Sequence, residues 1–130
     1  MKNKKGFTLI ELLAVIVILG IILTIATTTV IKNINDSKKK AKYIAARDIV
    51  NIAESYMFAE PDNVTNNCVS VTDLIEEEYL EEDVTNPETG ENGNIDDSQK
   101  VCKDDSITPQ EDYEVQNDRY LFDGYYYQIK

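Results

Sequence analysis

The feature that most constrains this chain is an uninterrupted apolar segment near its N-terminus. The twenty residues from Leu12 to Ile31 carry no charge and are rich in Leu, Ile and Val. A helix of about 20 apolar residues is long enough to cross the hydrocarbon core of a membrane. Because Lys2, Lys4 and Lys5 precede the segment, we expect its start to stay in the cytoplasm and the rest of the chain to lie outside.

The sequence pattern changes after the apolar segment without any signal for a helix break. No proline or glycine occurs between Gly20 and Pro61, so we expect one helix from about Phe7 to about Ala59, about 80 Å long at 1.5 Å per residue. From Ala41 on, apolar residues in its second half recur at spacings of three and four, which predicts an amphipathic helix over residues 32–60. The members of the predicted apolar face are Ile34, Ala41, Ala45, Ile49, Ile52 and Tyr56.

The remaining segment, residues 61–130, is strongly acidic. It contains nineteen acidic and four basic residues, a local net charge of −15 in a chain whose net charge is −11. Such a surface repels the phosphates of nucleic acids and anionic lipids, so direct nucleic-acid binding is not expected. The chain has no histidine, which excludes serine–histidine and cysteine–histidine catalysis. We assign no catalytic residue, no cofactor and no metal.

Loops and one short helix are predicted at the start of the acidic segment. Residues 61–67 begin with proline and are rich in Asn and Asp, which indicates an exit loop. Ser70 is a candidate cap for a helix from Asp73 to Leu80 that buries Leu74, Ile75 and Leu80. The segment from Asn86 to Gly93 is rich in turn residues and is expected to be exposed.

The end of the chain is predicted to form a small antiparallel sheet. Short β-prone stretches occur at Gln99–Cys102 and Tyr113–Gln116, and Asp123–Gly124 lies between two apolar runs, as in a hairpin. The predicted fold class is α+β, with the sheet packed on the amphipathic half of the long helix. The residues expected on the inner face of the sheet are Tyr125, Tyr127 and Ile129.

The two cysteines, Cys68 and Cys102, both lie in the acidic segment. If this segment is exported, a disulfide between them is expected, because an oxidising compartment pairs thiols. The closed loop of about 35 residues corresponds to about 4 kcal/mol of stabilisation in the chain-entropy model. A zinc site is the alternative, but two cysteines without histidine do not complete its tetrahedral ligand set.

An acidic residue, Glu11, lies at the start of the apolar segment. A removable signal peptide, cleaved near Thr24 to Ala26, is an alternative interpretation of this N-terminus. Against it, the apolar run is longer than usual, and a carboxylate within a membrane helix costs about 2.5 to 3.5 kcal/mol, less near the interface. A segment destined for degradation has no need of such a residue.

The stretch from Gly6 through Phe7 to Glu11, GFTLIE, resembles the class III signal of type IV prepilins. That signal has a short basic leader, Gly and Phe at the cleavage point, and an acid at the head of an apolar helix. The resemblance extends along the long helix, while the acidic head matches only in general layout. It implies four segments: a leader 1–6, a transmembrane and filament-core helix 7–31, its amphipathic continuation 32–60, and a globular head 61–130.

The resemblance also implies roles for single residues. A prepilin peptidase would cleave between Gly6 and Phe7, and the new N-terminus at Phe7 would be N-methylated. The carboxylate of Glu11 would then pair with the α-ammonium of Phe7 on a neighbouring subunit and set the register between subunits. Pilin helices often bend or melt on assembly in the zone that here contains Gly20, Thr27, Thr28 and Thr29. This zone lacks proline, and an unbroken helix is an equal alternative.

The implied function is that of a pilin, a structural subunit and not an enzyme. It would form a homo-oligomeric helical filament for adhesion, twitching motility or biofilm formation, built by the pilus assembly machinery. Its precursor would be a single-pass protein of the cytoplasmic membrane, and the many Asn and Ile residues fit a low-G+C, single-membrane bacterial host. A pseudopilin of a competence or type II secretion filament is the alternative.

A third interpretation is a monomeric, membrane-tethered binding domain. Asp96, Asp97, Asp104 and Asp105 flank Cys102, and Ca²⁺ takes several oxygen ligands on flexible loops. No EF-hand spacing is present, however, and a solvated acidic surface is the simpler explanation of these residues.

Overall fold

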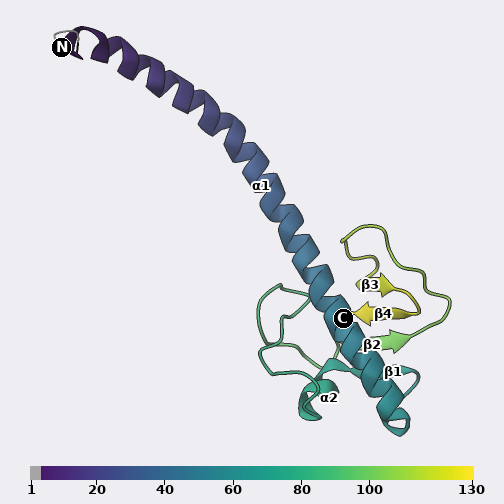
Figure 1. The fold of residues 1–130 in the computed structure, drawn as a ribbon. Helices are drawn as coiled ribbons and strands as arrows, with labels where there is room; N and C mark the ends of the chain where they lie inside the picture. Colours follow the sequence, from purple (N-terminus) through teal and green to yellow (C-terminus); the bar gives the residue numbers. More distant parts are fainter. Residues whose placement is uncertain (1–3) are drawn as a thin grey trace. The chain divides into compact units, whose positions relative to one another are not determined.

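The computed structural model describes residues 4–130, and the side chains of all of these except residues 4–7 and 28. Residues 1–3 of the predicted leader lie outside the described residues. In chain order the elements are helix α1 (Lys4–Ala59), 3₁₀ helix η1 (Pro61–Asn63), strand β1 (Cys68–Ser70), helix α2 (Val71–Glu76) and strands β2 (Lys100–Lys103), β3 (Arg119–Phe122) and β4 (Tyr125–Gln128) (Figure 1). The predicted α+β class is confirmed.

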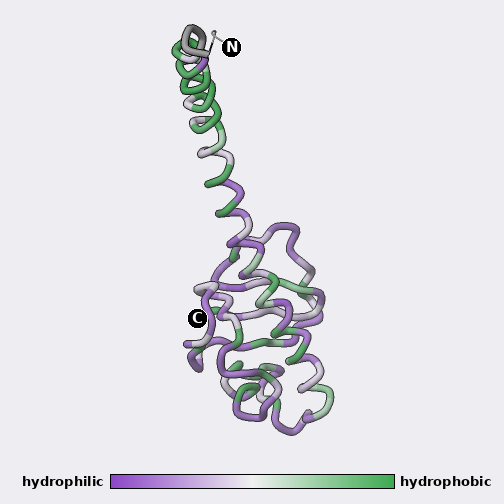
Figure 2. The backbone as a smooth tube through the Cα atoms, turned by 60° about the vertical axis from the view of Figure 1, so that its left-hand side comes forward, coloured by the Kyte–Doolittle hydropathy of each residue, from purple (hydrophilic) through white to green (hydrophobic). Residues whose placement is uncertain are grey.

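The chain divides into two structural units within α1. The first comprises the residues up to Ser37, and the second, here called the head unit, is Lys38–Lys130. The first part of the helix is largely hydrophobic, whereas hydrophobic and hydrophilic stretches alternate along the head unit (Figure 2). Most of the amphipathic segment therefore folds together with the acidic segment that follows it.

Helix α1 ends at Ala59, where the sequence predicts its end. Glu60 leaves the helical region, with φ −128° and ψ 61°, and Pro61 begins η1. The ring of a proline clashes with a helical conformation of the preceding residue, which explains the stop.

The sheet has strand order β1-β2-β4-β3 and is antiparallel throughout. Strands β3 and β4 form the predicted hairpin, with Asp123 and Gly124 as its two-residue turn. Gly124 has φ +76°, in the left-handed region where glycine carries no Cβ penalty. Strand β2 begins at Lys100, one residue after the predicted start at Gln99.

The core of the head unit lies between the sheet and the last part of α1. Tyr127 and Ile129 are buried and Tyr125 is partly buried against the core, as predicted. The ring of Tyr43 on α1 lies 5.1 Å from that of Phe122, centroid to centroid. The core residues that α1 contributes are Ala46, Ile49, Val50, Ala53 and Tyr56.

The buried face of α1 is rotated relative to the predicted face. Ile49 and Tyr56 are buried as predicted, but Ala41 is exposed and Ala45 is only partly buried. A second apolar stripe, which includes Ala46, lies beside the predicted one, and the sheet covers this second stripe. Helical spacing alone does not distinguish two adjacent stripes, because packing against the aromatic residues of the sheet decides between them.

Helix α2 is shorter than predicted and starts earlier. It spans Val71–Glu76 instead of Asp73–Leu80. Glu78 adopts a left-handed conformation, with φ +64°, and the backbone N–H of Tyr79 donates to the carbonyl of Leu74 at 2.9 Å. This is the six-to-one bond of a Schellman motif, which ends the helix there.

The predicted capping role of Ser70 is only partly correct. Ser70 is the N-cap residue, but its side chain forms no cap hydrogen bond; its hydroxyl lies 2.6 Å from that of Thr72. Thr72 in turn donates to Asp97 at 2.8 Å. The predicted burial of Leu80 is confirmed, and Ile75, also predicted to be buried, is partly buried.

The turn-rich segment 86–93 was predicted to be exposed, and this prediction is wrong for its start, because Asn86 and Pro87 are buried. The side-chain oxygen of Asn86 accepts from the N–H of Glu88 at 2.9 Å and from the amide of Gln99 at 3.0 Å, and its amide donates to the Asn94 carbonyl at 3.2 Å. A buried polar side chain is tolerated when its hydrogen bonds are satisfied. The hydrogen bonds of Asn86 therefore link parts of the loop to one another.

The predicted strand at Tyr113–Gln116 does not form. The side-chain amide of Gln110 donates to the carbonyls of Asp112 and Glu114 at 2.7 and 2.8 Å, and its oxygen accepts from the N–H of Leu121 at 2.8 Å. One side chain thus bonds backbone groups that a strand ladder would use, and the segment stays irregular.

Candidate assembly site

Gly6 and Phe7 lie in the described start of α1, which begins at Lys4. The backbone is therefore helical on both sides of the predicted cleavage bond. Glu11 follows Phe7 by four residues, which places the two about one turn apart on the same face of the helix. The side chain of Phe7 lies outside the described residues, so the predicted pairing of its amine with Glu11 of another copy stays a prediction.

The side chain of Glu11 is exposed within an apolar surface. Its neighbours Leu9, Ile10, Leu12 and Leu13 are 77, 72, 60 and 64% exposed. Glu11 forms no ion pair with any side chain that the structure describes. If lipid or protein covers this surface, the carboxylate loses its hydration, and this costs free energy unless a cation meets it.

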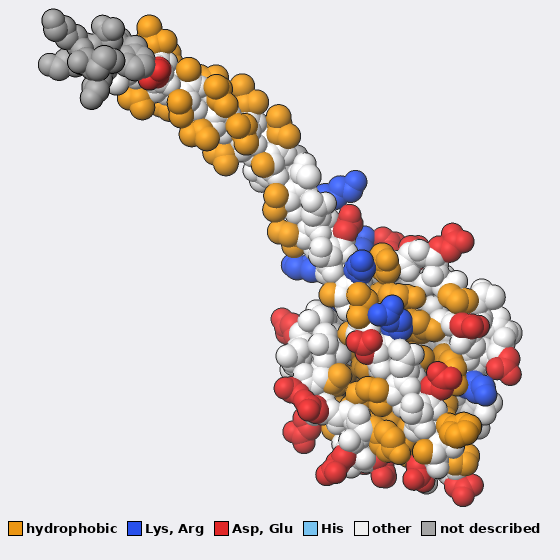
Figure 3. Space-filling view, viewed as in Figure 1, with side chains coloured by type: hydrophobic (Ala, Val, Ile, Leu, Met, Phe, Trp, Pro, Cys, Tyr) orange, Lys and Arg blue, Asp and Glu red, His pale blue; other side chains and the backbone are white. Residues whose placement is uncertain are grey.

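The apolar surface continues along α1 to Ile31. All described side chains of residues 8–31 are exposed, and apolar side chains cover most of the visible face of this part of the helix in Figure 3. A continuous apolar surface of this extent marks contact with a membrane or with other protein. By length and composition the helix can cross a membrane, a test that a signal sequence also passes.

The helix is unbroken through Gly20 and residues 27–29, where loosening was predicted as one alternative. The hydroxyl of Thr27 donates to the carbonyl of Leu23 at 2.5 Å. A hydroxyl bond to the carbonyl four residues earlier competes with the helix bond and slightly weakens the helix. Loosening during assembly stays a prediction.

Cys68 and Cys102 form the predicted disulfide, with an S–S distance of 1.97 Å and a Cα–Cα distance of 4.0 Å. They lie opposite each other in the register of β1 and β2. Because β1 is a three-residue strand at the edge of the sheet, the disulfide holds an element that has few ladder hydrogen bonds of its own.

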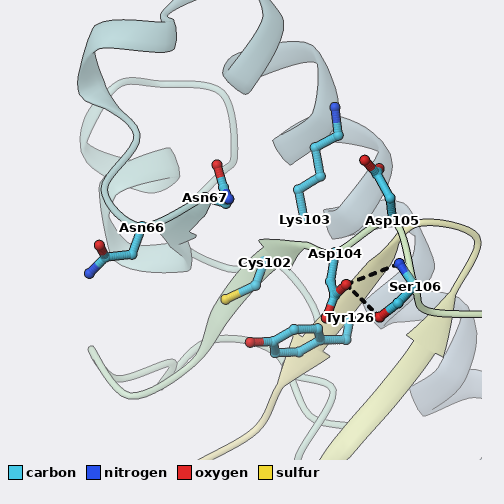
Figure 4. Close-up of a pocket in the computed structure, with 8 residues that line it drawn as sticks. All are labelled: Asn66, Asn67, Cys102, Lys103, Asp104, Asp105, Ser106 and Tyr126. Carbon is cyan, nitrogen blue, oxygen red and sulfur yellow. Dashed lines mark hydrogen bonds between the residues drawn. The ribbon is translucent and has the colours of Figure 1, made fainter.

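A polar pocket of about 630 Å³ lies beside the disulfide (Figure 4). On its wall Asp104 accepts hydrogen bonds from the hydroxyl and the backbone N–H of Ser106, at 2.6 and 3.0 Å, and these bonds lower the pKa of its carboxyl. Bonds from Ser98 lower the pKa of Asp96 in the same way. The hydrogen bonds that these two carboxylates accept stabilise the turns in which they lie.

Within the described part of the chain, no group of three or more Cys, Asp or Glu side chains is placed to hold a metal ion. The interpretation of the acidic clusters as a calcium site therefore gains no support from the geometry, since Ca²⁺ takes about six to eight oxygen ligands. Asp104 and Asp96 already use their carboxylates within the loops.

Sequence reasoning missed one exposed aromatic residue. Phe58, near the end of α1, is 92% exposed, while Tyr56 on the same helix is buried. The signal was present in the sequence, because a helical wheel places residue 58 away from the face that contains residues 49, 53 and 56. An aromatic side chain on an otherwise polar face is a candidate for contact with a partner.

Residues 1–27 match the family model described as the prokaryotic N-terminal methylation motif. The matched range contains Gly6, Phe7, Glu11 and most of the charge-free apolar segment. The comparisons with curated proteins and with solved structures find no protein similar to the chain. Residues 28–130, and with them the head unit, lie outside the matched range.

Proposed function

We propose that this chain, which carries in residues 1–27 the class III signal peptide of type IV pilins, is the structural subunit of a type IV pilus. The motif makes it a pilin-like or pseudopilin-like protein, implies a substrate of a prepilin peptidase, and fits a membrane-anchored precursor. Its activity is assembly without catalysis, and a cytoplasmic motor of the assembly machinery supplies the energy. The filament serves adhesion, motility or biofilm formation.

Maturation removes residues 1–6 and retains the helix. The peptidase cuts on the cytoplasmic side between Gly6 and Phe7, where Gly6 allows the backbone to enter a tight active site. Methylation of the Phe7 amine follows. Unlike the removal of an ordinary signal peptide, this cleavage leaves the whole apolar segment in the mature protein.

The observation that carries the proposal is the position of Glu11. Its exposed carboxylate lies in an apolar surface without a partner among the described side chains. Cleavage creates a cationic amine at Phe7, and on a neighbouring subunit this amine is the counter-charge that Glu11 lacks. Since each charge alone is penalised in a low-dielectric environment, the pair forms in one register and sets the axial stagger of the subunits.

The apolar segment supplies the contacts of the filament core. In the membrane lipid covers the side chains of residues 8–31, and in the filament the same surface packs against other copies. The acidic segment 61–130 faces outward, where its net negative charge keeps the filament surface hydrated.

Imaging of the cell surface tests the proposal. In a strain with the gene deleted, long extracellular fibres are expected to disappear, and a plasmid copy should restore them with this chain as their main component. Loss of DNA uptake or of protein secretion, with no such fibres in the parent strain, would instead assign the chain to a pseudopilus.

A further inference from the structure

A groove of about 350 Å³ lies at the C-terminal end of α1. Phe58 stands at this groove and is almost fully exposed to solvent. An exposed aromatic side chain next to apolar walls is typical of a protein contact, since it buries a large area at low cost in side-chain entropy. The groove is lined by Glu54, Met57, Phe58, Pro61, Val64, Asn67, Lys103 and Tyr125.

The charges around the groove favour a cationic partner. Glu54 lies in its wall, Glu60 and Asp62 follow in the exit from α1, and all three are exposed. No basic residue lies in the last turn of α1. The C-terminus of a helix carries partial negative charge, so acids there are unfavourable in the isolated chain, and Lys103 is the one base in the lining.

The same chain carries a helix face with the complementary properties. Ile34, Lys38, Ala41 and Ala45 follow one another at spacings of four, three and four, so they share one face of α1. Ile34 is 47% exposed. Within the head unit Ala41 is exposed and Ala45 is only partly buried, because the sheet covers the neighbouring stripe. One further base, Lys42, adjoins this face. Lys39 points away from it and pairs with Glu114 at 2.7 Å.

We propose that the groove of one copy binds the Ile34–Ala45 helix face of a second copy. An apolar helix face that carries Lys38 and adjoins Lys42 fits an apolar groove with an anionic rim, and the small alanines allow close approach. The two surfaces differ, so the contact is heterologous and each copy offers both halves, which generates an open polymer. The inference rests on the proposed function and adds a contact to the one at Glu11.

A charge exchange tests this contact. Glu54→Lys and Lys38→Glu each place like charges at the interface, and each should lower the amount of polymer, sheared from cells or cross-linked with formaldehyde, by at least about fivefold. The double variant restores opposite charges and should return to within about twofold of the wild type. Glu111→Lys, an exposed acid outside the groove lining, is the control and should leave the yield unchanged.

Truncation of the aromatic side chain gives a second readout. Because Phe58 is 92% exposed, Phe58→Ala should leave the melting temperature of the subunit unchanged and lower the polymer yield about tenfold, as for an interface anchor. Wild-type yield from this variant would overturn the inference.

The outcomes separate the two claims. The inference would be overturned if the polymer yield of the double charge variant were no higher than that of its single variants, or if the single variants gave normal yield. Fibres of the wild type would still leave the proposed function intact. If the wild-type chain itself forms no polymer and is not cleaved before Phe7, both fall together.

Discussion

Glu11 and Asn86 are both polar residues at positions where a missing partner costs free energy, and the chain accommodates them differently. Asn86 is buried with partners for its oxygen and its amide inside the head unit. Glu11 has no such partner among the described side chains and is exposed beside leucines and isoleucines. The first arrangement is complete within one chain, whereas the second is completed only by a charge from outside it.

Substitution of Glu11 therefore separates insertion from assembly. Glu11→Val should leave the membrane level of the subunit equal or higher, because the cost of a carboxylate in the membrane, about 2.5 to 3.5 kcal/mol at most, is removed. Fibre yield should fall more than about tenfold, since the loss of a buried charge partner costs about 3 to 5 kcal/mol. Immunoblots of membranes and of sheared fibres measure both quantities.

Glu111→Gln, an exposed acid in a loop of the head unit, is the matched control and should leave both quantities unchanged. Normal fibres from Glu11→Val would show that the charge pair is dispensable.

At the scale of elements, local signals predicted the helix end and the hairpin, and tertiary contacts decided the rest. Pro61 and the Asp123–Gly124 turn act within a few residues, so the sequence pattern is sufficient for both. The irregular conformation of Tyr113–Gln116 depends instead on hydrogen bonds from Gln110. The burial of Asn86 depends on Gln99, thirteen residues away. No periodicity in the sequence reports such bonds.

The candidate site follows the same division. The junction Gly6–Phe7 and the acid Glu11 are readable as a motif in the sequence, because their roles depend on chain position. The groove at Phe58 is formed by residues from α1, the loop after it, β2 and β4, and only the fold brings these together.

The disulfide is the element whose removal has the largest expected effect on the sheet. Cys68→Ser together with Cys102→Ser should lower the free energy of unfolding by about 4 kcal/mol, according to the chain-entropy model for a loop of this length. Thermal melting of the full chain in detergent, with and without reductant, measures the effect. If reductant lowers the melting temperature of the double variant as much as that of the wild type, the bond is not the cause.

Alkaline pH tests the packing of the sheet through Tyr127. Burial, followed by the charges of Asp96 and Glu88, raises the pKa of Tyr127 well above its ordinary value of 10.0. A raised pKa in the folded state means that the stability from this residue is fully present below pH 10 or so and is lost as the pH rises toward the folded pKa. We expect the melting temperature to fall in that range.

Tyr127→Phe isolates this contribution. The hydroxyl of Tyr127 donates to the side-chain oxygen of Gln99 at 2.6 Å, so its removal should cost about 1 to 3 kcal/mol at neutral pH. The decline above pH 10 should become shallower, because the group that ionises in the unfolded state is gone. An equally steep decline would assign the alkaline sensitivity to other groups, such as Tyr56, Tyr120 and Tyr125, whose pKa values are also raised.

At the scale of the whole molecule, each segment has a surface suited to a different environment. Residues 8–31 are apolar and exposed, and residues 32–47 carry six bases and one acid. Residues 61–130 are acidic and fold on the end of α1. A monomer in water leaves the first surface uncovered, whereas a membrane precursor and a polymer both cover it. The central claim is that cleavage before Phe7 preserves this surface for assembly.

The mass and N-terminal sequence of the chain recovered from cells test this claim most directly. The account predicts a mature protein that begins at Phe7, carries one added methyl group and retains the disulfide between Cys68 and Cys102. A chain that begins near Thr27, with the apolar segment removed, would contradict it.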